Sequence, residues 1–300
     1  MMELTALQQK LPAVCELKYN EPLQLHTSFR IGGNAEIMAF PKTEEELKAL
    51  LCASDLLDIT PRILGAGTNV LAPDEGIAGI VICLKDCLDG MEQLDANRIR
   101  VMAGVTLTRA AVFAANLGLS GLEFAHGIPG TVGGGVYMNA GAYGGEICNV
   151  LDSAQIMDMH GQIYSKTRDE MDFSYRHSIL ENCTDILISA TFVLEPKPED
   201  QIRSQMKELM AKRSASQPLD MPSAGSAFKR PSHSYAAALI DQAGLKGFSV
   251  GGAAVSEKHA GFIVNKGNAT ASDVKELIQT VSQRVYEKSG IRLEPEVRIW

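Results

Sequence analysis

The chain has 300 residues, of which 45% are hydrophobic and 21% charged, a composition typical of globular proteins rather than disordered or fibrous ones. Single hydrophobic cores stop growing near this length, so we expect more than one domain. The formal net charge of −8 gives no electrostatic footprint for a polyanion and argues against a DNA or RNA partner.

The start of the chain, residues 1–10, lacks the charged-then-apolar pattern of a signal peptide, and no apolar run reaches membrane-spanning length. We therefore expect a cytoplasmic protein without a membrane span. Its six cysteines are expected to be reduced thiols. Cys83 and Cys87 form a C-x-x-x-C pair, but zinc sites normally need a second cluster, so no metal site is expected.

The first clear element is a helix over residues 43–57. Thr43 and Glu46 have the spacing of a capping box, and leucines recur on one face after them. Pro61 follows and stops the helix. Short β-prone segments bounded by glycine then predict strands at 62–64, 79–84 and 98–105, and a helix over 108–117 ends at Gly118.

Residues 121–145 are dense in glycine and show neither a helical nor a strand period. Loops of this length inside a compact protein usually have a function, so we expect a ligand-binding loop system here. Strands are expected again at 154–159 and 186–194, followed by a stiff connector, Glu195-Pro196-Lys197-Pro198, which we interpret as a domain boundary.

Beyond the connector the pattern predicts a separate α+β unit. Its expected helices and strands are helices 200–213, 235–243 and 271–288 and strands 261–265 and 291–299.

The segment R-I-L-G-A-G-T-N-V-L, residues 62–71, leads a strand into a glycine turn followed by polar side chains. This layout allows a phosphate or a ring to approach the backbone closely. It is not a Rossmann fingerprint, because Val70 stands where G-x-G-x-x-G needs its third glycine, and no P-loop is present.

A second glycine-rich motif, H-G-I-P-G-T-V-G-G-G, spans residues 126–135 and is followed by N-A-G-A-Y-G-G at 139–145. Successive backbone N–H groups without Cβ atoms can cradle a pyrophosphate with few cations. We therefore interpret this stretch as a loop that wraps a ligand.

These motifs, in this order, resemble the FAD-binding domain of the UDP-N-acetylenolpyruvoylglucosamine reductases, which belong to the vanillyl-alcohol-oxidase-like flavoproteins. The resemblance extends upstream to H-T-S-F-R-I-G-G at 26–33 and downstream to Y-R-H-S at 175–178, A-G-S-A-F-K-R-P at 224–231 and L-E-P-E-V-R at 293–298. It covers nearly the whole chain. Each downstream motif alone is weak, and their order within one chain makes the resemblance specific.

The resemblance implies an α+β fold with an FAD-binding domain of the vanillyl-alcohol-oxidase (PCMH) type in two α+β subdomains, at 1–74 and 75–196. A C-terminal α+β substrate-binding domain is expected at 197–300. FAD would be held tightly but non-covalently, with NADPH as the reductant. The residues expected to bind FAD are Arg30, Gly65, Gly67, Thr68, Asn69, Val70, Gly127, Ile128, Pro129, Gly130, Thr131, Gly133, Gly134, Asn139, Ala140 and Gly141.

The reaction implied by the resemblance reduces an enolpyruvyl ether on a UDP-sugar, a step of peptidoglycan synthesis. Arg176 would stabilise the enolate with a charge that is always present, and a protonated Glu296 would help polarise the substrate carboxylate. Ser226 would give a proton to the carbanionic carbon. Glu294 lies on the same strand face as Glu296, so alternation does not separate them, and Glu296 matches the second glutamate of the family pattern.

The UDP-sugar is the expected small-molecule partner, and its diphosphate and uracil require local cations and aromatic or polar edges. Tyr175, Lys229, Arg230 and His259 are the candidates for holding it, with ordinary surface charge as the competing interpretation. The chain resembles the subclass without the tyrosine-bearing lid loop, because the stretch from Tyr175 to Ser226 is short. A monomer is expected.

Two other functions stay open at this point. Another flavoenzyme of the same fold could run in the opposite direction and oxidise an alcohol, because FAD loops alone do not set the direction of electron flow. A nucleotide-binding module without catalysis could use the same glycine loops.

Overall fold

The computed structural model describes residues 14–300, so the N-terminal segment at 1–10 lies outside the described residues. The chain forms two compact units. Unit 1 comprises the start of the chain through Tyr19 together with Glu36–Ala66 and Gly79–Ala211. Unit 2 comprises Asn20–Ala35, Gly67–Ala78 and Lys212–Trp300.

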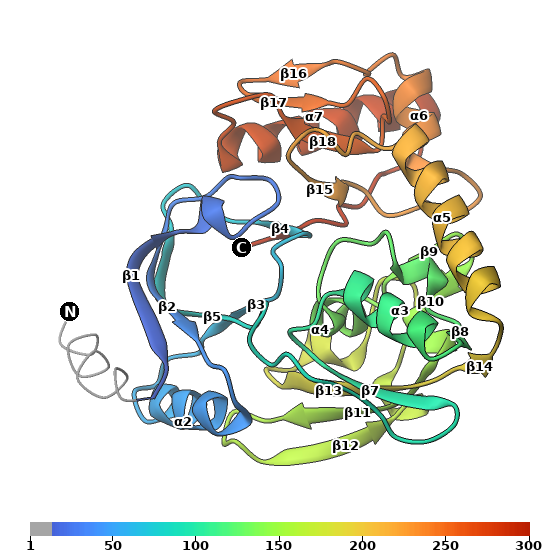
Figure 1. Ribbon diagram of the computed structural model, residues 1–300. Helices are drawn as coiled ribbons and strands as arrows, with labels where there is room; N and C mark the ends of the chain where they lie inside the picture. The colour runs from blue at the N-terminus through green and yellow to red at the C-terminus, as the bar shows by residue number, and fades with distance from the viewer. Residues whose placement is uncertain (1–13) are drawn as a thin grey trace. The chain divides into compact units, whose positions relative to one another are not determined.

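The first sheet of unit 1 has the strand order β1-β2-β5-β3, with the inner ends of three of its strands continuing into unit 2 (Figure 1). Its strands are β1 (Glu16–Pro22), β2 (Asn34–Phe40), β5 (Ile77–Cys83) and β3 (Arg62–Leu64), and β3 runs parallel to β5. Helix α2 (Glu44–Asp55) buries its leucine face in the core of this sheet. Thr43 accepts the Glu46 amide at its N-terminus, as the capping box predicts, but the Glu46 carboxylate accepts from the Lys42 amide at 2.6 Å instead of closing the box.

The second sheet of unit 1 is antiparallel, with the order β12-β11-β13-β7-β6. Its strands are β12 (Ile163–Thr167), β11 (Leu151–Met157), β13 (Ile186–Val193), β7 (Arg98–Met102) and β6 (Met91–Gln93). Helices α3 (Leu107–Asn116) and α4 (Val132–Tyr137) bury apolar side chains in the same core as β13 and β7. Because α4 packs against β13 and β7, the glycine-rich segment around it is fixed to a rigid sheet.

Unit 2 is built on a four-stranded antiparallel sheet with the order β15-β18-β17-β16 (Figure 1). Its strands are β15 (Ser223–Ser226), β18 (Phe262–Asn265), β17 (Ala253–Val255) and β16 (Ser249–Val250). Helices α6 (Ala236–Gln242) and α7 (Ala271–Ser289) bury apolar side chains in the core of this unit. Strand β19 (Arg298–Ile299) leaves this sheet and pairs in parallel with β4 (Val70–Leu71).

The remaining elements are short. They are η1 (Leu23–Leu25), β8 (Leu119–Ser120), η2 (Glu123–Ala125), β9 (Gly141–Ala142), β10 (Gly145–Glu146), η3 (Ile147–Asn149), η4 (Asp169–Met171), η5 (Ile179–Asn182) and β14 (Glu195–Pro196), and the longer helix α5 is Glu199–Ser216.

The mixed α+β class and most of the predicted elements are confirmed. Two differ. The segment 121–145 was expected to be loop throughout, but it contains α4 and the β9–β10 hairpin, because Thr131 caps a short helix whose glycines allow close packing. The strand expected over 291–299 is regular only at Arg298–Ile299, preceded by a bridge between Phe228 and Pro295.

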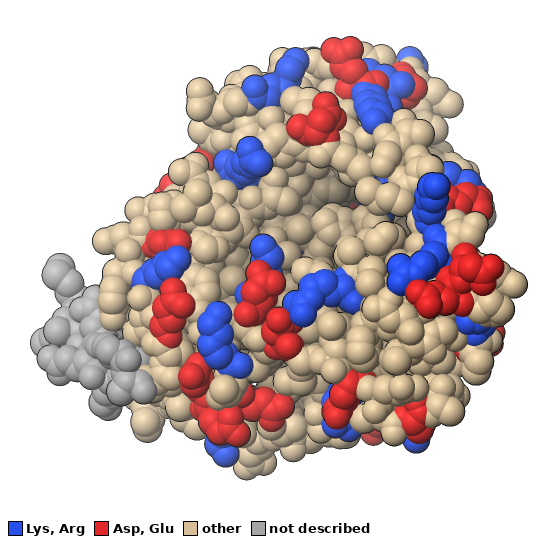
Figure 2. All heavy atoms as spheres, in the orientation of Figure 1, with Lys and Arg blue, Asp and Glu red and all other residues tan. Residues whose placement is uncertain are grey.

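The expected boundary segment at 195–198 pairs with unit 1, since β14 is antiparallel to β8. Among residues 14–300, no helix combines the length and the apolar character that crossing a membrane requires. The surface in view carries positive and negative side chains interspersed, without a continuous patch of one sign (Figure 2).

Candidate active site

The first glycine loop, residues 65–69, follows strand β3. Its amides at Gly65, Ala66, Gly67 and Asn69 donate no hydrogen bond to any residue of the described chain. Gly67 has a φ of +62°, and a Cβ there would lie 2.1 Å from the carbonyl oxygen of His26. Only glycine fits this position, so the first glycine loop is held tightly against the H-T-S-F-R segment of unit 2.

The second glycine loop, residues 126–135, ends in helix α4. Thr131 caps α4 by accepting the Gly134 amide, while the amides of Gly133 and Gly135 bond to backbone carbonyls. The amides of Gly127, Gly130 and Thr131 find no acceptor among the residues that the structure describes. Three unsatisfied donors in one turn form a ready-made site for an anion.

The two glycine loops meet inside unit 1. A Cβ at Gly65 would lie 2.6 Å from the Thr131 hydroxyl oxygen, so the absence of a side chain at Gly65 is what lets the loops approach. Several backbone donors without an acceptor in adjoining, partly buried loops can bind a ligand with acceptor oxygens. The residues present therefore fit the pyrophosphate of FAD.

His126 begins the second glycine loop with a buried Nδ1 atom that has no hydrogen-bond partner in residues 14–300. Burial lowers the pKa of His126, so the imidazole is neutral near pH 7. Its backbone is fixed by the Thr108 hydroxyl, which donates to the His126 carbonyl at 2.7 Å. No sequence pattern marks this side chain as functional, because an unsatisfied atom can be recognised only in the three-dimensional structure.

Asn139 was expected to bind the cofactor, and its side chain makes three hydrogen bonds within unit 1. Its amide nitrogen donates to Glu146 and to the carbonyl of Ser174, each at 3.0 Å, and its oxygen accepts from the Cys148 amide. Asn139 is 1% exposed. The geometry gives its side chain the role of tying the N-A-G segment to the Y-R-H-S segment.

Arg176 stands at the tip of a tight turn closed by reciprocal hydrogen bonds between Ser174 and His177. Its φ of +57° places a residue with a long side chain in the left-handed region of backbone conformation. This conformation costs free energy and is typical of functional sites. The guanidinium donates to the carbonyl of Gly141 at 3.1 Å and stacks on the ring of Tyr175. The arginine is thus anchored to the N-A-G segment of unit 1.

The segments that carry Ser226 and Glu296 are hydrogen-bonded to each other within unit 2. Ser226 ends strand β15, and the carbonyl of the next residue, Ala227, accepts from the Glu296 amide at 2.9 Å. The Lys229 amide continues this pairing by donating to the carbonyl of Glu294. Residues distant in sequence therefore share one backbone ladder.

The two glutamates of the C-terminal motif differ in environment. The Glu294 side chain is 77% exposed and forms an ion pair of 3.7 Å with Lys229, whereas Glu296 is half-buried. The lower exposure of Glu296 makes it the better candidate for contact with a ligand. The Lys229 ammonium already has a carboxylate partner.

The other residues expected to bind the substrate differ in their exposure and in their side-chain partners. Arg230 is exposed and stacks on Tyr235, and Tyr175 is 45% exposed. His259 is half-buried, and its Nδ1 accepts from the Gly261 amide at 3.2 Å. Burial, with a smaller contribution from Lys246, lowers the pKa of His259, so its ring is neutral and its Nδ1 is used within its own turn.

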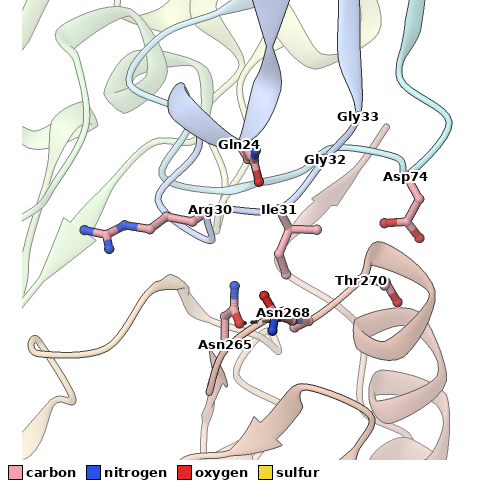
Figure 3. A pocket seen from close by; sticks show the side chains of 10 residues that line it. Gln24, Arg30, Ile31, Gly32, Gly33, Asp74, Asn265, Asn268 and Thr270 are labelled. Atoms are coloured by element: carbon pink, nitrogen blue, oxygen red, sulfur yellow. Dashed lines mark hydrogen bonds between the residues drawn. The ribbon is translucent and has the colours of Figure 1, made fainter.

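Arg30, an expected cofactor residue, borders a polar hollow of about 250 Å³ in unit 2. Its guanidinium extends away from the other labelled side chains, which come from the 20–35 segment, Asp74 and the stretch 265–270 between the end of β18 and the N-cap of α7 (Figure 3). Arg30 has a left-handed backbone, with a φ of +55°. The structure thus groups Ser226 with Glu296, places Arg176 in unit 1, and brings the glycine loops together.

Comparison with known proteins identifies two families along the chain. A family described as UDP-N-acetylenolpyruvoylglucosamine reductase, C-terminal domain, matches residues 217–300, and an FAD binding domain matches residues 35–166. The glycine loops lie within the second match, and Ser226 and Glu296 within the first.

Relatives match over nearly their whole length. The UDP-N-acetylenolpyruvoylglucosamine reductase of Agathobacter rectalis is 47% identical, with 97% of this chain and 96% of that protein covered. That of Latilactobacillus sakei is 45% identical, with 94% and 93% covered. The crystal structure of the corresponding reductase from Thermus caldophilus superposes with a TM-score of 0.79 at 36% identity and covers 95% of this chain and 98% of that one.

Proposed function

The chain belongs to the family of UDP-N-acetylenolpyruvoylglucosamine reductases, and on this premise we propose that it reduces the enolpyruvyl group of UDP-N-acetylenolpyruvoylglucosamine to give UDP-N-acetylmuramate for peptidoglycan. The chain is an FAD-dependent oxidoreductase of that family. The observation that carries the assignment to specific residues is the Ala227–Glu296 hydrogen bond, which joins the serine and glutamate motifs.

FAD, when bound, supplies hydride transfer, with NADPH as the source of the electrons. Within unit 1, the unpaired amides of Gly65, Gly127, Gly130 and Thr131 would hold its pyrophosphate, and Gly67 is proposed to contribute to cofactor binding. Thr68, Val70, Ile128, Pro129, Gly133, Gly134, Ala140, Gly141 and Arg30 are proposed to complete the cofactor site.

Each catalytic residue has one proposed task. Arg176 meets the negative charge that develops on the substrate when hydride arrives, because a guanidinium stays protonated at all working pH values. Ser226 donates a proton from its hydroxyl oxygen to the carbanionic carbon, and Glu296 in its protonated form polarises the substrate carboxylate. The turn at Arg176 fixes the arginine within unit 1, and the backbone ladder at Ala227 fixes the serine and glutamate segments within unit 2.

The UDP-sugar is proposed to contact Tyr175, Lys229, Arg230 and His259. Lys229 would exchange its exposed partner Glu294 for the diphosphate, since an exposed ion pair is worth little. A neutral His259 would offer its remaining ring nitrogen as a hydrogen-bonding group rather than a charge. A monomeric, cytoplasmic enzyme fits this small-molecule chemistry.

The proposal is tested by two half-reactions followed through flavin absorbance. The oxidised holoenzyme should bleach with NADPH and regain its yellow colour when the enolpyruvyl sugar is added without oxygen. Bleaching by an alcohol, with no recovery on adding the sugar, would instead favour an oxidase of the same fold.

The serine has its own test. Ser226→Ala should retain FAD and be reduced by NADPH at the normal rate, while reoxidation by the sugar falls by roughly 10²–10⁴-fold, the usual contribution of a positioned acid. Ser249→Ala, at an exposed serine of β16 in the same sheet, is the matched control and should behave as wild type. Unchanged reoxidation of Ser226→Ala would remove its role as proton donor.

A further inference from the structure

The peptide group of Glu296 is hydrogen-bonded on both sides. Its N–H donates to the carbonyl of Ala227 at 2.9 Å, and its C=O accepts from the side-chain nitrogen of Asn69 at 3.1 Å. Ala227 follows Ser226, and Asn69 closes the first glycine loop. One residue thus links the proposed proton donor to the proposed cofactor loop, within unit 2.

The backbone of Asn69 is fixed to the same C-terminal segment. Its carbonyl accepts from the Arg298 amide at 2.9 Å, and two residues later the carbonyl of Leu71 accepts from the Trp300 amide at 3.1 Å. These bonds belong to the parallel pairing of β4 with β19. Because the pairing fixes which residues of the C-terminal segment lie beside Asn69, the Asn69 side chain reaches the carbonyl of Glu296.

The orientation of the Asn69 amide follows from chemistry. A backbone carbonyl only accepts hydrogen bonds, so the nitrogen of the amide must face Glu296 and the oxygen must face away. That oxygen makes no hydrogen bond to another described residue. One of the two N–H groups of the Asn69 side chain is therefore engaged by the main-chain carbonyl of Glu296.

We propose that Asn69 is a positioning residue for Glu296: its side-chain amide fixes the peptide of the glutamate beside the Ser226–Ala227 peptide and relative to the first glycine loop. The inference rests on the proposed function and deepens it. Without the amide, the carbonyl of Glu296 loses the hydrogen bond that ties this peptide to the side chain of Asn69. A small displacement of a reacting group costs far more in rate than in stability.

The experiment compares Asn69→Ala and Asn69→Asp with the wild-type holoenzyme. The aspartate keeps the shape of the side chain but cannot donate when ionised, so it answers the question even where the alanine variant folds poorly. In holoenzyme saturated with FAD, both variants should be reoxidised by the enolpyruvyl sugar about 10–100-fold more slowly than wild type.

Ser282→Ala is the matched control. The Ser282 hydroxyl donates to the carbonyl of Leu293 at 3.0 Å, so this variant removes a side-chain bond to the same segment without touching Glu296. Its reoxidation rate should equal that of wild type. If it slows as much as Asn69→Ala, general loosening of the segment explains the effect and the positioning role of Asn69 is wrong.

A double-mutant cycle tests whether Asn69 acts through Glu296. Adding Asn69→Ala to Glu296→Gln should cost no further activity, because residues acting through one group are not additive. Independent, multiplying losses, or a wild-type rate for Asn69→Ala alone, would overturn the inference.

Amide hydrogen exchange keeps the inference separate from the proposed function. Exchange across residues 296–300 should quicken in Asn69→Ala and not in Ser282→Ala, whatever substrate the enzyme uses. If wild type is not reoxidised by the sugar but this exchange difference is seen, the proposed function fails and the structural link stands. No difference in exchange means that Asn69 does not hold Glu296.

Discussion

Gly67 is the residue at which the first glycine loop is most constrained. Its φ is +62°, and a Cβ would lie 2.1 Å from the His26 carbonyl oxygen, so two separate penalties apply to any side chain. The left-handed backbone costs an alanine about 1–2 kcal/mol, and the overlap with backbone cannot relax by moving a flexible side chain. Gly67→Ala should lower the free energy of unfolding by more than about 2 kcal/mol and weaken FAD binding.

Gly244 provides the matched control for this prediction. Its φ is +72°, but nothing lies within 4 Å of where a Cβ would stand. Gly244→Ala should therefore cost only the backbone term and leave FAD affinity unchanged. Urea unfolding and FAD titration of both apoproteins measure the difference, and equal losses in the two variants would mean that the contact with His26 is unimportant.

Single residues show why a site can be located from sequence while the roles of its side chains cannot. Motifs placed Asn69 and Asn139 in the cofactor site. In the structure the Asn69 side chain donates to the Glu296 carbonyl. The Asn139 side chain hydrogen-bonds to Glu146, Ser174 and Cys148. Partners far away in sequence decide such hydrogen bonds. Strand alternation likewise could not separate Glu296 from Glu294, because both lie on the same strand face. The lower exposure of Glu296 in the structure favours Glu296.

At the scale of elements, Asp74 joins the 67–78 segment to helix α7. Its carboxylate oxygens accept from the amides of Ala271 at 2.7 Å and Ser272 at 3.0 Å. These two amides lie in the first turn of α7, where an N–H group has no acceptor within the helix. Asp74→Ala should cost about 1 kcal/mol, the usual value of a helix cap. Asp241→Ala, which removes an exposed ion pair with Lys246, should change stability by less than about 0.5 kcal/mol in the same thermal unfolding assay.

Helix α7 also shows what local patterns predict well. Its five-residue apolar stripe is buried, Thr270 forms the capping box and Gly290 ends the helix in a left-handed conformation, so its limits follow from neighbouring residues alone. The short helix α4 was missed because its glycines carry no apolar period, and its stability comes from packing on β13 and β7. Strand 291–299 was overextended because its partners are two separate segments, 227–229 and 69–71.

At the scale of the whole molecule, order of motifs carried more information than any one of them. Glycine loops, an arginine turn and a glutamate strand each occur in many folds, and only their sequence along one chain specified the family that the relatives confirm. The division into two units was harder to predict from the sequence. Each unit is built from three separate segments, and the chain passes from one unit to the other at positions where its composition does not change.

A ligand that engages both glycine loops should stabilise the folded chain through its phosphates. The unpaired amides of Gly65, Gly67, Gly127, Gly130 and Thr131 are donors only, so they gain most from acceptor oxygens. FAD at about one hundred times its dissociation constant should stabilise the apoprotein by about 2.7 kcal/mol, seen as a higher melting temperature. Riboflavin, which has the ring system without phosphates, should stabilise it far less.

ADP and adenosine separate the phosphates from the rest of the dinucleotide. ADP retains the pyrophosphate and should raise the melting temperature and compete with FAD, whereas adenosine at the same concentration should do neither. Because mass action stabilises only through binding to the folded state, the ranking of the four ligands reports directly on which groups the loops hold. Equal stabilisation by riboflavin and FAD would show that ring contacts, and not the bare amides of the glycine loops, provide the affinity.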